Sequence, residues 1–223
     1  MYRSSGAWTQ ASTLFRKLIA DSANDPRYLA IYVAALLEHG ETTNAGAYLD
    51  RLEAAVPNHF NTVSLRAEVL VAKGEPQKAL DLLNEFVDRV GARPPEKYLR
   101  VRLVSEKCEQ LARQLNSPQQ KALKDEFLHK AEMNCRVFLD TNPEKSPAQN
   151  MILVGFFARQ LRTDDALDLL RGTWERSNPT VISQVVSLLL RNENITRTQQ
   201  DRLEDILKQA TNRFDRPAPL LMI

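Results

Sequence analysis

The residues best able to do chemistry in this sequence are three histidines and one pair of adjacent aspartates. His39, His59 and His129 each stand alone, because none has a histidine or a paired carboxylate four residues away, the spacing that puts two metal ligands on one helix face. Asp164 and Asp165 could act as paired carboxylates, but they fall in the expected first turn of a helix, where acids favour the helix dipole and help to cap the end. The sequence therefore predicts no metal site and no catalytic pair.

Other chemical signatures are equally sparse. Cys108 and Cys135 lie 27 residues apart without a Cys-x-x-Cys pair, and we interpret both as reduced, buried, small hydrophobic residues. The sequence has no Gly-x-Ser-x-Gly nucleophile turn, no Gly-x-x-x-x-Gly-Lys phosphate loop and no Gly-x-Gly-x-x-Gly fingerprint. We therefore expect a protein that is not an enzyme and that needs no cofactor.

The composition narrows the class of partner. Of the 223 residues, 43% are hydrophobic, which is enough to build a core, and 30 basic against 28 acidic side chains leave a net charge of +2. This balance lacks the basic excess of a surface that follows phosphates, so we expect no nucleic acid partner. The N-terminus has no secretory signal, and the longest apolar run, residues 151–158, is too short to cross a membrane. The expected location is the cytoplasm, or the periplasm for a segment cut from a longer chain, with no membrane in this segment.

The elements that must position any site repeat along the chain. Ala11, Ala45 and Ala79 are 34 residues apart, and the apolar residues four and seven positions after each alanine keep the same period. Gly40 and Gly74 lie five residues before the second and third alanines, where one helix must end before the next begins. Between these breaks, apolar residues recur at intervals of three and four. The pattern predicts two amphipathic helices per repeat.

The expected helices cover most of the chain, and nothing in the sequence indicates a strand. Ser117 followed by Pro118 and Gln120 has the chemistry of a capped helix start, and Thr196 with Gln199 repeats it without the proline. The expected helices span residues 8–22, 27–39, 43–56, 60–73, 76–90, 95–115, 118–140, 147–160, 163–177, 180–191 and 197–213.

A helix pair with alanine at the crossing point, glycine before the second helix and proline after it resembles the tetratricopeptide repeat (TPR), whose period is also 34 residues. The resemblance implies an all-α fold: a right-handed superhelical solenoid of antiparallel helix pairs. We expect one domain over residues 1–223. It would contain a partial unit at 8–22, units at 26–57, 60–91, 95–143, 147–178 and 180–213, and a tail at 214–223.

The fourth unit differs because about 18 residues have been added to it. Apolar residues from Tyr98 to Leu115 and from Leu123 to Phe138 step by three and four along two long helices, which predicts an elongated helical hairpin near 95–140. Its basic side chains outnumber the acidic ones. Either a solvated face with mixed charges or an arm that docks an acidic partner would explain this excess.

The resemblance also implies a binding site. In repeats of this type the first helix of each pair lines a concave groove, which can hold an extended peptide or a partner helix. The groove positions implied by the family register are Arg27, Ala30, Ala34, Glu38, Asn61, Ser64, Glu68, Ala72, Ala148, Met151, Gly155 and Arg159.

We therefore expect a non-catalytic protein-interaction module in a larger, bacterial scaffold protein. Two alternatives stay open: an RNA-binding helical-hairpin repeat protein, which would need a basic concave face, and an enzyme built on a helical toroid, which would need converging acids or bases. The tail ends in four apolar residues after Pro217 and Pro219. It is expected to be disordered or to pack into a groove, either its own or that of a neighbour, which makes self-association possible.

Overall fold

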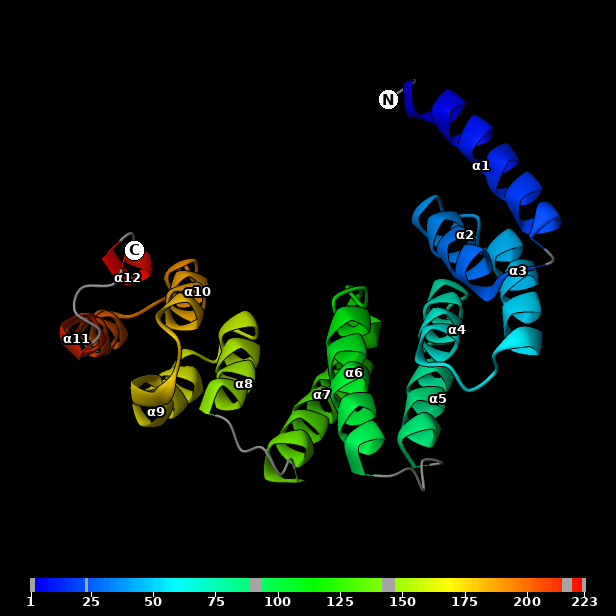
Figure 1. Cartoon of the computed structure of the whole chain (residues 1–223). Helices are drawn as coiled ribbons and strands as arrows, with labels where there is room; N and C mark the ends of the chain where they lie inside the picture. The colour runs from blue at the N-terminus through cyan, green and yellow to red at the C-terminus, as the bar shows by residue number, and fades with distance from the viewer. Residues whose placement is uncertain (1–2, 23, 89–93, 142–146, 214–217, 222–223) are drawn as a thin grey trace. The chain divides into compact units, whose positions relative to one another are not determined.

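The computed structural model describes residues 3–22, 24–88, 94–141, 147–213 and 218–221, which form helices joined by turns (Figure 1). The all-α prediction is confirmed for this part of the chain. The longer helices are α1 (Arg3–Asp21), α2 (Pro26–Glu38), α3 (Thr42–Ala55), α4 (Phe60–Ala72), α5 (Pro76–Asp88), α6 (Pro94–Ala112), α7 (Lys121–Thr141), α8 (Pro147–Arg159), α9 (Thr163–Thr173), α10 (Pro179–Leu190) and α11 (Arg197–Arg213). The short ones are η1 (Pro118–Gln120), η2 (Trp174–Arg176) and α12 (Ala218–Leu221).

The contacts of the chain divide it into two compact units, residues 1–131 and 132–223. The first unit contains α1 to α6 and the first half of α7, and the second contains the rest of α7 and α8 to α12. The assignment of residues 1–223 to one domain stays a prediction.

Within each unit, helices pack against their neighbours in sequence. In the first unit α2 packs against α3 and α4, and α4 packs against α5 and α6. In the second, α8 packs against α9 and α10, and α9 packs against α11. Turns of three residues join α2 to α3 and α4 to α5, which leaves the chain too little length to do anything but reverse direction. The predicted helix pairs are therefore present.

The recurrent alanines lie in the core. Ala45, Ala79, Ala131 and Ala166 are fully buried, whereas Ala11 on α1 is half-buried. A methyl group is small enough to let two helices approach closely, and a larger side chain at such a position must displace its neighbours. The 34-residue period therefore marks packing positions, as the sequence predicts.

The turns within the pairs use left-handed backbone. Gly40 and Gly74 have φ angles of +73° and +79°, a conformation that glycine adopts without steric cost. Leu161 takes the equivalent place in the turn from α8 to α9 with φ +58°, and the Arg162 amide after it donates to the Phe157 carbonyl at 3.0 Å. Leu161 is also 60% exposed. The third turn of this type is thus built with a residue that the left-handed region disfavours.

The elongated hairpin is formed by α6 and α7, which have 19 and 21 residues where α4 and α5 have 13 each. The Ser105 hydroxyl donates to the Ala131 carbonyl at 2.6 Å and so joins the two helices. The predicted apolar seam is buried at Val101, Val104, Cys108, Leu111 and Leu115, and at Phe127, Ala131, Cys135 and Phe138. The side chain of Tyr98 lies outside the described residues. Neither cysteine forms a disulfide, as expected.

Part of the C-terminal tail packs on its own chain. Helix α12 contacts α10 and α11, and Leu220 on α12 is buried. Of the two outcomes predicted for the tail, residues 218–221 take the packed one. Residues 214–217 and 222–223 lie outside the described part of the chain.

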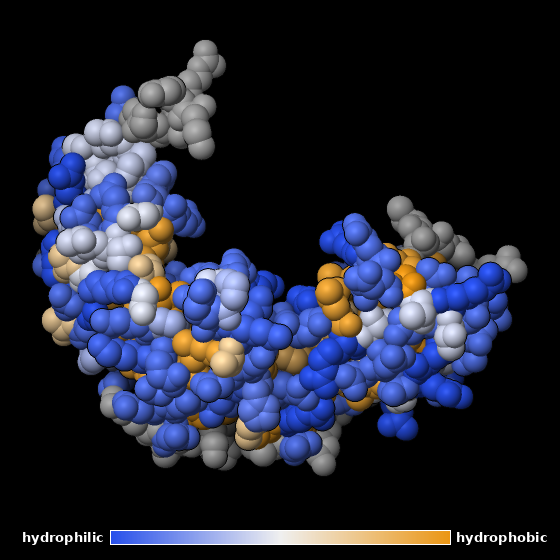
Figure 2. Space-filling view, turned by 180° about the vertical axis from the view of Figure 1, so that it is seen from behind, coloured by the Kyte–Doolittle hydropathy of each residue, from blue (hydrophilic) through white to orange (hydrophobic). Residues whose placement is uncertain are grey.

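The surface is mostly hydrophilic. Figure 2 shows one face on which blue, hydrophilic residues predominate and orange, apolar residues form small separated patches. One apolar side chain that reaches solvent is Ile31 on α2, which is 54% exposed. Exposed side chains of this size are of interest where they adjoin a hollow, because burying them would favour the binding of a partner.

Candidate functional site

Three of the predicted groove residues lie around one hollow, which we call the α2–α4 cavity. It has a volume of about 420 Å³ and lies between α2, the end of α3 and the start of α4 (these helices are labelled in Figure 1). Its lining residues are Pro26, Arg27, Ala30, Ile31, Leu52, Val56, His59, Asn61 and Thr62. The structure therefore brings together Arg27, Ala30 and Asn61, which lie up to 34 residues apart in the sequence.

Capping interactions fix the two helix starts at this cavity. The Asp25 carboxylate accepts the Arg27 amide at 2.8 Å and so caps α2, while His59 Nδ1 accepts the Asn61 amide at 3.3 Å at the start of α4. The Thr62 hydroxyl donates to the Val56 carbonyl at 2.9 Å and joins the end of α3 to α4. The lining is thus placed by local hydrogen bonds that the sequence pattern did not single out.

The charge at the rim of the cavity is already paired. The Arg27 guanidinium donates to Asp25 at 2.7 Å, and this side-chain hydrogen bond holds the pKa of Asp25 below its usual value. The interior is lined largely by Ala30, Ile31, Leu52 and Val56. Its chemistry therefore favours an apolar side chain rather than a charged group.

The other predicted groove positions of the first unit have different environments. Ala34 is half-buried against the core of the first repeat, and Ser64 is buried. Glu38 and Ala72 are exposed. Glu68 on α4 forms an ion pair with Lys107 on α6.

In the second unit, most of the described groove positions are buried. Met151 is buried and its sulfur accepts the Thr173 hydroxyl at 3.7 Å. Gly155 is also buried, and a β-carbon placed there would lie 3.2 Å from a guanidinium nitrogen of Arg159, which is itself exposed. The side chain of Ala148 lies outside the described residues. The assignment of these four positions to a groove stays a prediction.

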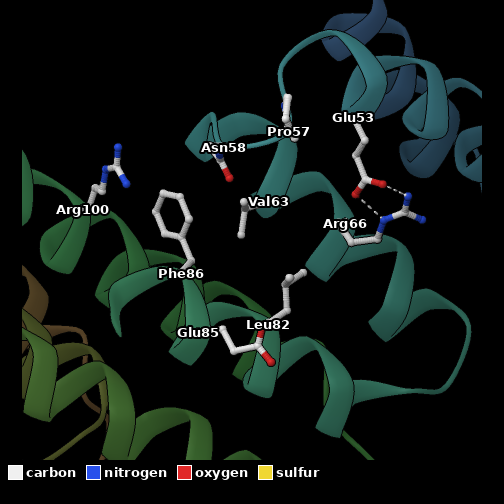
Figure 3. Close-up of a pocket in the computed structure, with 9 residues that line it drawn as sticks. All are labelled: Glu53, Pro57, Asn58, Val63, Arg66, Leu82, Glu85, Phe86 and Arg100. Carbon is white, nitrogen blue, oxygen red and sulfur yellow. Dashed lines mark hydrogen bonds and ion pairs between the residues drawn. The ribbon is translucent and has the colours of Figure 1, made fainter. Parts of the chain in front are cut away.

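A second hollow, which we call the Phe86 cavity, was not anticipated from the sequence. It has a volume of about 570 Å³ and lies among α3, α4, α5 and α6 (Figure 3). Its lining residues are Glu53, Pro57, Asn58, Val63, Arg66, Leu82, Glu85, Phe86 and Arg100. The only local sequence signal was the breaker Pro57, which was taken as the end of a helical repeat.

One side of the Phe86 cavity is an ion-pair cluster. The Arg66 guanidinium donates to both carboxylate oxygens of Glu53, one of them at 2.6 Å, and to Asp50 at 2.7 Å. The hydrogen bonds to Glu53 raise the pKa of Arg66 above its usual value despite the opposing effect of burial. Arg66 is thus fixed in place by its own acids, as the dashed lines in Figure 3 indicate for Glu53.

The predicted capping role of Asp164 and Asp165 is wrong in its detail. Both residues lie in the first turn of α9, but the residue before this helix, Arg162, receives no side-chain capping hydrogen bond. Asp164 instead accepts Gln199 and Arg202 of α11 at 2.9 and 3.0 Å, and Asp165 accepts Arg162 at 2.7 Å. These carboxylates therefore link helices and a turn, a role set by helix packing rather than by local sequence.

Within the described ranges, the structure shows no group of three or more His, Cys, Asp or Glu residues that could hold a metal ion. Burial raises the pKa of the Cys108 thiol to about 12, which leaves it protonated and a poor nucleophile at neutral pH. None of the helices, as far as the structure describes them, is both long and apolar enough to cross a membrane.

No protein-family model and no curated protein matches this chain. Among solved structures, the chain is similar to YrrB, described as a TPR protein with an unusual peptide-binding site. The identity is 14% and the TM-score is 0.40, over 93% of this chain and 96% of YrrB.

Proposed function

We propose that this chain is a non-catalytic protein-interaction module that binds a polypeptide segment along α2 and α4. The observation that carries the proposal is the α2–α4 cavity, in which small Ala30 opens a hollow beside the 54% exposed side chain of Ile31. Covering Ile31 would remove apolar surface from water, which is the main favourable contribution to association. The module would serve as part of a larger scaffold protein.

The chemistry of the lining favours a peptide or helix carrying an apolar anchor. Leu52 and Val56 give the cavity an apolar wall, while the Asn61 side chain is exposed and can bond to a peptide group. A single side chain that fills a well-packed pocket often supplies most of the binding energy of an interface. We therefore place the anchor in this cavity and the flanking residues along the exposed positions of α2 and α4, including Glu38 and Ala72.

The experiment fills the cavity and asks whether peptide binding is lost. Random peptides displayed on phage are selected against the whole chain, and the dissociation constants of the selected peptides are measured by fluorescence polarisation. Ala30→Arg places a long side chain in the hollow and should weaken binding at least about tenfold. Ala47→Arg is the matched control, because Ala47 is exposed on α3 and lines neither cavity.

The proposal fails if no peptide is selected, or if the selected peptides bind the Ala30→Arg variant as tightly as the unaltered chain. Thermal unfolding followed by circular dichroism shows whether both variants keep the fold. A loss of affinity shared equally by both variants also contradicts the proposal, because the α2–α4 cavity would then not be the site.

A further inference from the structure

The Phe86 cavity combines an apolar wall with a cation that has no acid to neutralise it. Phe86 and Val63 are buried at the wall, and Leu82 lies beside them on α5. The Phe86 ring is held by Phe60, with the ring centroids 5.9 Å apart. The guanidinium carbon of Arg100 lies 5.0 Å from the centroid of the Phe86 ring. The cation is therefore positioned by the aromatic ring.

The acids around this cavity do not compensate Arg100. Glu53 is engaged by Arg66 on the other side of the hollow, as Figure 3 shows. Glu85 lies beside Leu82, well apart from Arg100 in the same view. Among the carboxylates that the structure describes, none pairs with Arg100. The cavity thus presents a half-buried, uncompensated positive charge next to an apolar surface.

We propose that the Phe86 cavity is a second binding site for a polypeptide segment in which a bulky apolar side chain adjoins a carboxylate. The apolar side chain would pack on Phe86, Val63 and Leu82, and the carboxylate would accept hydrogen bonds from Arg100. An Arg–carboxylate contact is charge-assisted and often bidentate, which makes it stronger than a neutral hydrogen bond. The volume of about 570 Å³ is ample for one such residue with its neighbour.

This site is independent of the one proposed above. The Phe86 cavity and the α2–α4 cavity have no lining residue in common. A partner could therefore occupy either cavity alone, and the two proposals can fail separately.

The experiment uses two probes that differ in one charge. Acetyl-Asp-Phe-amide and acetyl-Asn-Phe-amide are titrated into the isotope-labelled whole chain, and backbone amide shifts are followed by NMR spectroscopy. The aspartate probe should shift the amides of Val63, Leu82 and Phe86 and should bind about five- to tenfold more tightly than the asparagine probe. N-acetylphenylalanine and its amide form a second pair, which tests whether a terminal carboxylate serves as well as a side chain.

Two variants assign the charge effect to one residue. Arg100→Gln should abolish the difference between the aspartate and asparagine probes. Arg102→Gln should leave it intact, because Arg102 on the same helix is exposed and already donates to Glu106 at 3.0 Å. Ala30→Arg should also leave it intact.

Equal affinity for the charged and uncharged member of both probe pairs would overturn the proposal, and this comparison needs no variant to fold. Shifts confined to residues of α2 would also overturn it, as would a charge effect that survives Arg100→Gln. If only the terminal-carboxylate pair shows the charge effect, the site binds the carboxyl-terminal residue of a polypeptide.

Discussion

The ion pair between Glu68 and Lys107 offers the sharpest test of how the first unit is held together. Lys107 on α6 is only 7% exposed, and its ammonium donates to the Glu68 carboxylate of α4 and to Gln110 Oε1 at 3.0 Å. Replacing Glu68 by leucine removes the counter-charge and leaves a nearly buried ammonium with one neutral acceptor.

The burial of the two partners sets the size of the effect. Removing one partner of a fully buried pair costs about 3–5 kcal/mol, whereas an exposed pair contributes less than about 1 kcal/mol. The Glu68 side chain is 21% exposed and Gln110 remains available to Lys107. We therefore expect Glu68→Leu to lower the free energy of unfolding by about 2 kcal/mol. Adding Lys107→Met removes both charges and should return the stability to within about 1 kcal/mol of the unaltered chain.

Urea unfolding followed by circular dichroism measures these differences. Glu106→Leu is the matched control, because it breaks an exposed pair with Arg102 on the same helix and should change stability by no more than about 0.5 kcal/mol. Equal losses for Glu68→Leu and Glu106→Leu would refute the reasoning. So would a double variant at Glu68 and Lys107 that is less stable than Glu68→Leu alone.

Three further predictions follow from the fold. Leu161→Gly should raise the free energy of unfolding by about 0.5–1 kcal/mol, because it relieves a left-handed backbone, and Gly74→Ala should lower it by a similar amount in the same urea assay; opposite signs would contradict the role given to this turn. Ala79→Leu, at a fully buried helix contact, should cost about 1–3 kcal/mol through overpacking, and an unchanged urea midpoint would place the methyl group outside the core. In a Cys135→Ser background, Cys108 should resist alkylation by iodoacetamide at neutral pH until urea unfolds the chain, since burial keeps its thiol protonated; rapid labelling of the folded chain, measured by mass spectrometry, would disprove this.

Local periodicity made the helices predictable. The burial of Ala79 and the positive φ of Gly74 both follow from residues a few positions away, because helix periodicity and turn chemistry act over short stretches of chain. Leu161 shows the limit of this approach. It occupies the place that glycine fills in two other turns, and its residue type gives no hint of a left-handed conformation.

Contacts between distant residues could not be predicted in the same way. Glu68 and Lys107 are 39 residues apart, and their pairing depends on how α4 packs against α6. The Phe86 cavity likewise needs side chains from four helices, from Glu53 on α3 to Arg100 on α6. Such features arise from crossing geometry, which the spacing of apolar residues leaves undetermined.

The packing of each helix on its near neighbours in sequence has a consequence for how the chain reaches its native state. Pairs such as α2 with α3 and α4 with α5 close loops of only a few residues, so the entropy lost in forming them is small. Chains with such low contact order fold rapidly, and nucleation can begin at any pair. The same locality lets one hairpin lengthen without rearranging distant parts, which accounts for how α6 and α7 accommodate their extra turns.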